Sequence, residues 1–394
     1  MGKTVSCFTR PLRIEMNFKE LAILPALETA LAKEKITIPT SIQVESIPAI
    51  MAGKDDFTSS ETGSGKTLAY LLPLLSTLDI ASKNLQIIIL TPTHELSSQI
   101  QSELIKLNQA SGLGFRSQLL IGSASPNRQL DKLKKKPHIV VGSSGRMLEL
   151  IKMRKLKVHA VKTMVIDEAD RMLFGESLEL IEDILRAMLK ERQMIYVSAT
   201  NQTESNETIE MLSPGVIDIH TQSNKVVDDI EHICFTAHEN DKPKLLCKLI
   251  NACAPERAIV FTHRNETAGR IAKKLAEHKI LVGELHGECD KQSRVKTINH
   301  FRSGKVKILV ASDMAARGLD IKGVTHIFNV DAPGKSKDYL HRAGRTGRAG
   351  AHGYCISLMS GEEQKIVRRY ERELKIIIKQ ASIYEGVITY EKKD

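Results

Sequence analysis

The 394-residue sequence contains no tryptophan, and aromatic residues make up only 4% of it. Base stacking needs aromatic side chains, so a nucleic-acid partner would have to be held mainly through its backbone. No apolar run approaches the roughly 20 residues of a membrane helix, and residues 1–10 lack the hydrophobic stretch of a secretory signal. We therefore expect a cytoplasmic protein that does not enter a membrane.

The cysteines also exclude two classes of protein. No C-x-x-C pair and no His/Cys group at zinc-ligand spacing is present, so neither a disulfide framework nor a zinc site is indicated. We expect the cysteines to be small core residues in a reducing compartment. They are Cys7, Cys234, Cys247, Cys253, Cys289 and Cys355.

Positive charge is in excess and is unevenly distributed. The chain has 57 Lys and Arg against 47 Asp and Glu, a net charge of +10. Residues 1–220 hold 26 basic and 25 acidic residues, whereas residues 221–394 hold 31 and 22. This excess favours a polyanionic partner, although many proteins without one are mildly basic.

Short apolar runs alternate with segments of helical periodicity, a pattern typical of parallel sheets covered on both faces. The helical segments include residues 96–107, where Leu96, Ile100, Leu104 and Leu107 share one face, and residues 266–278. The pattern predicts two α/β domains. The strand-like runs are residues 86–90, 138–141, 163–166, 194–197, 258–261, 306–311 and 325–330.

A polar stretch at residues 221–229 separates the two series of runs and follows the turn signal Ser213-Pro214-Gly215. We therefore place one domain at residues 1–220, a short flexible linker at 221–229 and a second domain at 230–394. A short linker permits relative movement of the domains. After a last helix at residues 362–376 we expect little more structure, so the chain would be a bare two-domain core.

Residues 61–67 (ETGSGKT) open the apolar helix 68–78. Glycines let successive backbone N–H groups point at one anion, a helix N-terminus adds partial positive charge, and Lys66 adds a full one. The hydroxyl of Thr67 suits a magnesium ion. The segment therefore predicts a triphosphate site, although Ser60 stands where the strict phosphate-loop pattern has its first glycine.

The strand-like run 163–166 ends in Asp167-Glu168-Ala169-Asp170. Carboxylates at the carboxyl end of a buried parallel strand lie at the crevice where α/β sheets bind ligands. Asp167 is placed to hold magnesium, and Glu168 to orient or deprotonate a water that attacks the γ-phosphate. An acidic turn is the alternative for the segment alone, but the phosphate loop makes it far less plausible.

The second half contains residues 341–348 (HRAGRTGR). We interpret Arg345 and Arg348, three residues apart on one helical turn, as arginine fingers that reach the γ-phosphate when the domains close. A basic stretch that binds phosphate backbones directly is the alternative.

Together with shorter motifs, these segments resemble the DEAD-box family of ATP-dependent RNA helicases, and the chain is similar to its small bacterial members. The resemblance covers roughly residues 18–360, in the family's order and approximate spacing. The matching segments are Phe18, 39–43 (PTSIQ), 61–67, Pro92-Thr93, 167–170 (DEAD), 198–200 (SAT), 312–320 and 341–348.

The resemblance implies two tandem RecA-like domains that close around ATP, Mg²⁺ and single-stranded RNA. Its catalytic residues are Lys66, Asp167, Glu168, Arg345 and Arg348, and its metal ligands are Thr67 and Asp167. Gln43 would contact adenine with Phe18 nearby, and Asp320 would contact the ribose. The nucleotide-binding residues are Phe18, Gln43, Thr62, Gly63, Ser64, Gly65, Lys66, Thr67 and Asp320.

A second set of residues is implied in RNA binding or in coupling the RNA and ATP states, with Ser198 and Thr200 assigned to coupling. We expect backbone recognition with little sequence preference, and a monomer. The set is Pro92, Thr93, Gly122, Gly145, Arg146, Ser198, Thr200, Gly287, Arg294, Ser312 and His341.

Departures from the family pattern concentrate on the RNA-facing motifs. On the ATP side only Ser60 differs. On the RNA side the departures are His94 for Arg, Ser123 for Gly, Ser143-Ser144 for Thr-Pro, Lys291 for Gln and Ser312 for Thr. We hypothesise that ATP chemistry is intact while RNA affinity or coupling is retuned; drift without consequence is the alternative.

The leading interpretation is an RNA-dependent ATPase that separates short duplexes or remodels RNA–protein complexes, for example in ribosome assembly. An ATP-controlled RNA clamp with little turnover is the alternative. A DNA helicase is disfavoured by the motifs.

Overall fold

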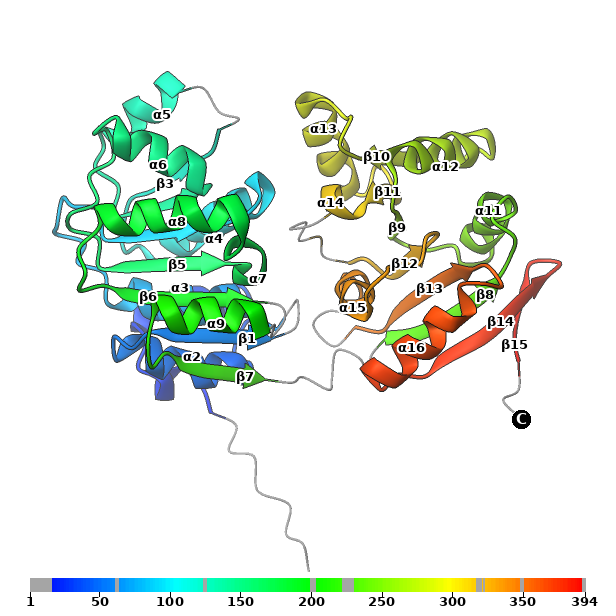
Figure 1. Ribbon diagram of the computed structural model, residues 1–394, viewed down its shortest axis with the longest axis horizontal. Helices are drawn as coiled ribbons and strands as arrows, with labels where there is room; N and C mark the ends of the chain where they lie inside the picture. Colours follow the sequence, from blue (N-terminus) through cyan, green and yellow to red (C-terminus); the bar gives the residue numbers. More distant parts are fainter. Residues whose placement is uncertain are drawn as a thin grey trace, which may run out of the picture.

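The computed structural model describes residues 16–60, 64–122, 126–198, 203–221, 230–316, 321, 323–347 and 351–391. Its strands form two separate sheets, one built from residues up to Thr221 and the other from Ile230 onward. Figure 1 shows the two sheets in two α/β bodies, each with helices on both faces. The described residues include no helix that is both long and apolar enough to cross a membrane.

The first sheet has the order β3-β4-β2-β5-β6-β1-β7, and every pair of neighbours is parallel. Its central strands are fully buried runs of branched apolar residues, as expected for strands covered on both faces. The strands are β1 (Asp56–Ser60), β2 (Ile87–Leu90), β3 (Ser117–Leu120), β4 (Ile139–Gly142), β5 (Thr163–Asp167), β6 (Gln193–Ser198) and β7 (Ile217–Thr221).

Two buried clusters of apolar side chains fill the space between this sheet and its helices. One cluster lies under α6 and α8, and the other under α1, α3 and α4. The helices are η1 (Phe18–Leu21), α1 (Pro25–Lys33), α2 (Ser41–Met51), α3 (Lys66–Ser76), α4 (His94–Ser111), α5 (Pro126–Leu133), α6 (Ser144–Lys152), α7 (Ala169–Met172), α8 (Gly175–Ala187) and α9 (Thr203–Leu212).

The second sheet has the order β10-β11-β9-β12-β13-β8-β14-β15. All neighbours are parallel except β14 and β15, which form an antiparallel hairpin at one edge. The strands are β8 (Ile230–Thr236), β9 (Ala258–Thr262), β10 (Val282–Leu285), β11 (Ile308–Ser312), β12 (His326–Asn329), β13 (Gly353–Met359), β14 (Ile378–Tyr384) and β15 (Val387–Tyr390).

Helices again cover both faces of the second sheet. One buried cluster includes side chains of α13, α14, α15 and α16, and the other includes those of α11 and α12. The helices are α11 (Lys242–Cys253), α12 (Asn265–Glu277), α13 (Lys291–Arg302), α14 (Asp313–Ala316), α15 (Ser336–Ala343) and α16 (Gln364–Leu374).

The predicted class, two α/β domains with mostly parallel sheets, is confirmed. Two expectations need correction. The helix after the phosphate loop begins at Lys66 rather than at residue 68, so Lys66 lies in its first turn. The chain also does not end soon after its last helix, because β14 and β15 follow α16 and are joined by a turn in which Glu385 and Gly386 both have positive φ.

Candidate functional site

Three neighbouring strands of the first sheet, β5, β6 and β1, end beside one another. Their last residues are Asp167, Ser198 and Ser60. The segment that follows β1 therefore opens on the same crevice as the carboxylates that follow β5, the usual ligand position in α/β sheets. In Figure 1 these strands point toward the second domain, so the crevice faces it.

The described part of the phosphate loop is shaped around a backbone turn that only glycine adopts easily. Gly65 has φ +92°, and a Cβ added there would lie 2.5 Å from Nε2 of Gln43. The Gln43 amide donates to the Gly65 carbonyl at 3.1 Å, while its oxygen accepts from the backbone N–H of Thr40 at 3.0 Å. Gln43 therefore fixes both the loop and the start of α2.

The loop also presents groups suited to an anion. Lys66 donates to the carbonyl of Ser60 across the loop. The hydroxyl oxygen of Ser64 is buried and has no hydrogen-bond partner among the described residues. Since buried polar groups are normally paired, this hydroxyl together with the N-terminus of α3 fits a ligand with phosphate oxygens.

Asp167 is held in the crevice by two hydrogen bonds. Its carboxylate accepts from the Tyr70 hydroxyl at 3.0 Å and from the backbone N–H of Glu168 at 2.9 Å. Burial, followed by the charge of Glu168, raises the pKa of Asp167 to about 6, although the hydrogen bond from Tyr70 and the charge of Lys66 act to lower it. A carboxylate with this little compensation fits a site for a hard cation such as Mg²⁺.

Glu168 adopts a backbone conformation that is unusual for its residue type. Its φ of 56° and ψ of 50° lie in the left-handed region, and Arg171 holds its carboxylate at 2.9 Å. Strained conformations of this kind persist where the surroundings fix them and are concentrated at functional sites. The strain places the Glu168 side chain immediately beside Asp167.

Three more neighbouring strands of this sheet, β3, β4 and β2, end next to the segments predicted to bind RNA. Thr93 caps α4 by accepting from the N–H of Leu96 at 3.2 Å, and Ser143 is the N-cap of α6. Gly145 lies in the first turn of α6 and Gly122 in an exposed turn. These segments therefore share one half of the crevice, beside the nucleotide half.

Arg146 is more enclosed than an exposed RNA contact would be. It is only 6% exposed and pairs with Glu149 at 2.6 Å. Its Nε and Nη2 are buried without a hydrogen-bond partner among the described residues. These atoms leave donors available near the N-terminus of α6.

One predicted geometry in the second domain is wrong. Arg345 does not lie on a helical turn, because α15 ends at Ala343 and Gly344 is its C-cap. Arg345 lies in the turn that follows, and Gly347, two residues later, has a φ of +66°. The helix thus ends before Arg345, which is half-buried in a turn whose other described residues are buried.

A contact between the domains joins two of the RNA-side segments. Arg294 on α13 lies with Nε 2.6 Å from the Glu95 carboxylate in the first turn of α4. Its Nη2 also donates to the carbonyl of Ala315 at 3.0 Å. Both charged side chains are more than three-quarters buried, at 22% and 23% exposure.

The remaining predicted residues fall in three groups. Phe18 is buried in the core cluster under α1, and Ser312 is buried at the end of β11. Gly287 donates its N–H to Asn265 at 3.3 Å, and His341 lies on α15. Outside the described residues lie Thr62, Gly63, Ser123, Thr200, Asp320 and Arg348.

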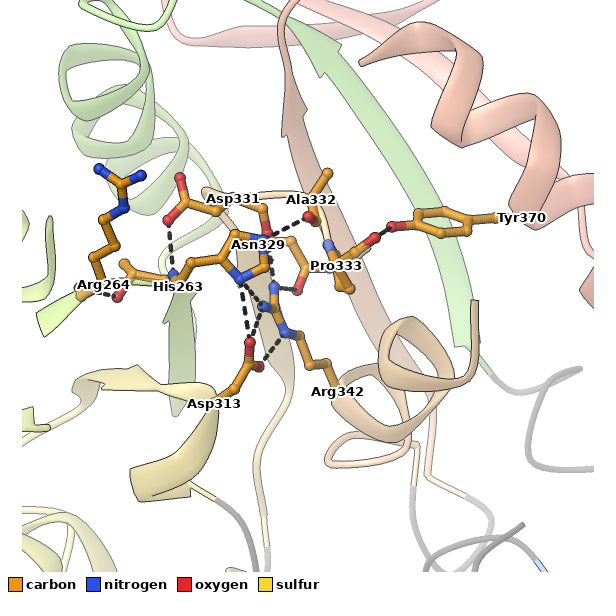
Figure 2. A network of polar contacts seen from close by, with 10 residues as sticks. His263, Arg264, Asp313, Asn329, Asp331, Ala332, Pro333, Arg342 and Tyr370 are labelled. Atoms are coloured by element: carbon orange, nitrogen blue, oxygen red, sulfur yellow. Dashed lines mark hydrogen bonds and ion pairs between the residues drawn. The ribbon is translucent and has the colours of Figure 1, made fainter. Parts of the chain in front are cut away.

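Sequence reasoning missed three residues at this site. Tyr70 lies one helical turn after Lys66, a spacing that could have identified it. Glu95 and Arg342 could not be recognised without the tertiary contacts they make. Glu95 bridges the domains, and Arg342 binds Asp313 with Nε and Nη2 at 2.6 Å (Figure 2).

Two parallel-sheet domains with a phosphate loop and carboxylates at the facing strand ends define a RecA-like nucleotide hydrolase. Residues 40–209 match the DEAD/DEAH box helicase family, and residues 241–350 match the helicase conserved C-terminal domain. The chain is 36% identical over 365 residues to the DEAD-box ATP-dependent RNA helicase CshC of Bacillus cereus, covering 92% of each chain. It therefore belongs to the DEAD-box family of ATP-dependent RNA helicases and is an ATP-hydrolysing enzyme.

Two solved structures of the yeast protein Dbp5 differ in their likeness to this chain. S. cerevisiae Dbp5 bound to RNA and ADP BeF3 gives a TM-score of 0.83 at 27% identity, covering 92% of this chain and 95% of the other. A Dbp5 variant bound to Nup159, Gle1, IP6 and ADP gives 0.68 at 25% identity, covering 91% and 95%. A further structure of a Dbp5 variant, bound to Gle1 and IP6, gives a TM-score of 0.80 at 26% identity, so this likeness does not depend on bound RNA.

Proposed function

We propose that this chain is an RNA-dependent ATPase that separates short RNA duplexes locally or remodels RNA–protein complexes. ATP binds in the half of the crevice formed by β5, β6 and β1. RNA binds in the half formed by β3, β4 and β2 together with α13 of the second domain. Closure of the two domains completes both halves, so each ligand promotes binding of the other.

The ion pair between Glu95 and Arg294 carries this proposal. Glu95 follows the predicted RNA residues Pro92 and Thr93, and Arg294 is itself a predicted RNA residue. Their 2.6 Å contact supports a closed arrangement in which RNA-side segments of both domains meet.

Within the nucleotide half, the loop and α3 bind the phosphates. Gly65 lets the backbone approach them closely, Lys66 leaves the Ser60 carbonyl to bind phosphate oxygens, and Ser64 gains the partner it lacks. Gln43 contacts the adenine with Phe18 nearby, and Asp320 contacts the ribose. Thr62 and Gly63 complete the loop.

Thr67 and Asp167 would hold Mg²⁺, which neutralises phosphate charge when bound. The structure supports this assignment because Tyr70 fixes Asp167 while leaving its pKa raised. A nearby cation favours the ionised carboxylate, so metal binding should lower the pKa of Asp167 that burial raises.

Hydrolysis then requires a positioned water and positive charge at the γ-phosphate. Arg171 orients the Glu168 carboxylate, which accepts a hydrogen bond from the water and takes its proton. Arg345 and Arg348 provide positive charge from the second domain. Because they come from a separate domain, turnover depends on closure, and Ser198 and Thr200 report the nucleotide state to the RNA half.

The RNA half offers helix N-termini and basic groups more than aromatic surfaces. The first turns of α4 and α6, with Gly122, Gly145, Arg146, Gly287, Ser312 and His341, suit a phosphate backbone. We therefore propose binding with little sequence preference, by a cytoplasmic monomer with domains at residues 1–220 and 230–394 and a linker at 221–229. Ribosome assembly is the proposed setting.

The test measures ATP hydrolysis with and without single-stranded RNA, and strand separation of a short RNA duplex. We expect RNA to stimulate hydrolysis and ATP to be needed for separation. Hydrolysis that RNA leaves unchanged would contradict the proposal. A DNA strand of the same sequence is the matched control, since contacts to 2′-hydroxyl groups favour RNA.

Glu168→Gln distinguishes a turnover enzyme from a nucleotide-controlled clamp. The amide keeps the side-chain shape but cannot take a proton, so an enzyme loses both hydrolysis and duplex separation. A clamp would instead keep its cellular function and hold RNA as tightly as the wild type or more tightly. Glu176→Gln, which alters a carboxylate at the start of α8, is the control.

A further inference from the structure

Four charged or titratable side chains meet where three neighbouring strands of the second sheet end. His263 follows β9 directly, Asp313 follows β11 directly, and Asp331 comes two residues after β12. Arg342 on α15 covers them and is only 3% exposed. Figure 2 shows His263, Asp313 and Arg342 pointing toward one another, while the guanidinium of Arg264 points away.

Arg342 is almost fully engaged inside the protein. Its Nε and Nη2 donate to the two oxygens of Asp313, each at 2.6 Å. Its Nη1 donates to the Asn329 side chain at 3.0 Å and to the Asp331 carbonyl at 2.8 Å. A guanidinium has five N–H groups, so one of those on Nη2 remains, and it faces Nδ1 of His263 at 3.4 Å.

The His263 ring has two possible arrangements that differ by one proton. Its Nε2 lies 2.7 Å from the Ala332 carbonyl, which can only accept, so Nε2 carries hydrogen. Its Nδ1 lies 3.3 Å from Asp313 Oδ2 and 3.4 Å from Arg342 Nη2. A neutral ring accepts from Arg342, whereas an imidazolium donates to Asp313.

The charges of the cluster favour the imidazolium. Asp313 and Asp331 are both negative, and Oδ2 of Asp331 accepts the backbone N–H of His263 at 2.8 Å. The single positive charge of Arg342 compensates only one of these two negative charges. A second positive charge, on a protonated His263, therefore makes the cluster neutral overall. In agreement, the hydrogen bond to Asp313 raises the pKa of His263, although burial opposes the shift.

We propose that His263 is a positioning residue for the second domain's half of the ATPase site, and that its imidazolium form holds Asp313 against Arg342. The proposal rests on the proposed function. Asp313 begins α14, and Arg342 precedes the turn that carries Arg345. The proton on His263 thus sets how two functional segments lie relative to each other.

The same short helix links the cluster to the domain interface. Arg294 donates to the carbonyl of Ala315 on α14 and pairs with Glu95 of the first domain. Asp313 therefore anchors one end of α14 while Arg294 holds the other. Loss of the His263 proton loosens α14, and the effect reaches closure as well as the position of Arg345.

The experiment measures RNA-stimulated hydrolysis from pH 6 to 9 for four proteins. They are the wild type, His263→Asn, His263→Arg and the control His278→Gln, which alters an exposed histidine at the end of α12. We expect the wild-type kcat to fall about fivefold as pH rises through the His263 pKa, while ATP affinity measured without RNA changes little. His278→Gln should follow the wild-type profile.

The two His263 variants separate charge from shape. His263→Asn cannot be charged and should give about fivefold lower kcat at pH 6.5 with a flatter profile. His263→Arg keeps a positive charge at all these pH values, so it should be flat and retain most of the activity. A His263→Asn profile parallel to that of the wild type would overturn the proposal.

An NMR titration of the ligand-free full chain does not depend on enzyme activity. We expect the His263 pKa to exceed the ordinary 6.5 and to fall in Asp313→Asn. A value at or below 6.5 overturns the proposal, whatever RNA does to hydrolysis. If the titration agrees while RNA fails to stimulate the wild type, the proposed function is wrong and the charge cluster still stands.

Discussion

Asp167 ends β5 of the first sheet and Asp313 directly follows β11 of the second, so both carboxylates lie at the carboxyl ends of buried parallel strands. Their environments are opposite. Among the described residues, Asp167 accepts hydrogen bonds from two neutral donors, and burial raises its pKa to about 6. Burial would also raise the pKa of Asp313, but hydrogen bonds from His263 and Arg342 outweigh it and hold the pKa well below its usual range.

This difference agrees with the separate roles that we propose for the two carboxylates. Asp167, for which we propose a bound cation, has little positive charge around it, and burial of its charge opposes folding. A group that must hold the fold together receives its cation from the chain itself. The strand ends of the two sheets thus hold buried carboxylates in two ways: one fits a site for a cation, and the other is closed into an internal charge cluster.

The largest expected effect comes from removing the Lys66 charge in the first site. Lys66→Ala takes away the positive charge that we propose binds phosphate and that also lowers the pKa of Asp167. We expect nucleotide binding or hydrolysis to be abolished, as measured by ATP titration and steady-state turnover. Lys83→Ala, at an exposed lysine, should be unaffected.

Arg345→Ala tests whether the second sheet contributes to the chemistry of the first. Because Arg345 would act only in the closed state, we expect turnover to fall by up to about 10³-fold while ATP affinity changes little. Equilibrium binding of ATP beside single-turnover hydrolysis would separate the two. Equal damage to both would assign Arg345 another role.

Removing the internal cation of the second site should affect stability more than chemistry. Arg342→Ala leaves Asp313 partly buried without its main partner, which costs about 3 kcal/mol of unfolding free energy. The matched change in the first site, Arg171→Ala, breaks a more exposed pair and should cost less than about 1 kcal/mol. Urea unfolding of both variants measures the two losses of unfolding free energy. Similar losses in Arg342→Ala and Arg171→Ala would contradict the expected difference between the two sites.

The first sheet also holds a second under-compensated acid. Asp56 is fully buried, its Oδ1 has no hydrogen-bond partner among the described residues, and burial raises its pKa to about 7. The folded chain therefore keeps a proton there that the unfolded chain, with an ordinary pKa of 3.8, releases.

Stability should accordingly fall as pH rises from about 4 through 7, by at most about 4 kcal/mol. Asp56→Asn removes this titrating group, so the unfolding free energy should depend less on pH. Unfolding free energies of the wild type and the variant at pH 5.5 and pH 8 measure the difference. Asp131→Asn, at an exposed carboxylate, should keep the wild-type slope.

Much of this organisation follows from local sequence. Buried apolar runs predicted β2, β4, β5 and β6, and glycine beside lysine predicted the phosphate loop. The strand β1 was not predicted, because its sequence DFTSS is polar; its burial depends on Thr58 donating to Asp56 at 2.6 Å. The hairpin β14–β15 was missed although Glu385-Gly386 is a turn signal between two strand-like segments.

Contacts between distant segments were beyond prediction. His263, Asp313 and Arg342 lie far apart in the chain and meet only because β9 and β11 are neighbours under α15. The sequence likewise has no local signal that Glu95 would find Arg294 in the other domain. Gly142 is a similar case, since a Cβ there would lie 1.8 Å from the Leu120 carbonyl.

The smallest expected effect concerns the RNA half. His94 is the first residue of α4, and Ser144 is the first residue of α6, the position where proline is pre-organised for a helix. The double variant His94→Arg, Ser144→Pro adds a permanent positive charge and fixes one φ angle. We therefore expect the RNA concentration for half-maximal stimulation to fall a few-fold, which corresponds to about 1 kcal/mol of binding free energy. ATP affinity without RNA should not change, because His94 and Ser144 follow β2 and β4, whereas the proposed nucleotide half is at the ends of β5, β6 and β1. If the RNA concentration for half-maximal stimulation does not change, the departures from the family pattern at these two positions have no effect on RNA affinity. The two halves of the crevice would then differ in their chemistry, but the RNA half would not have an altered affinity.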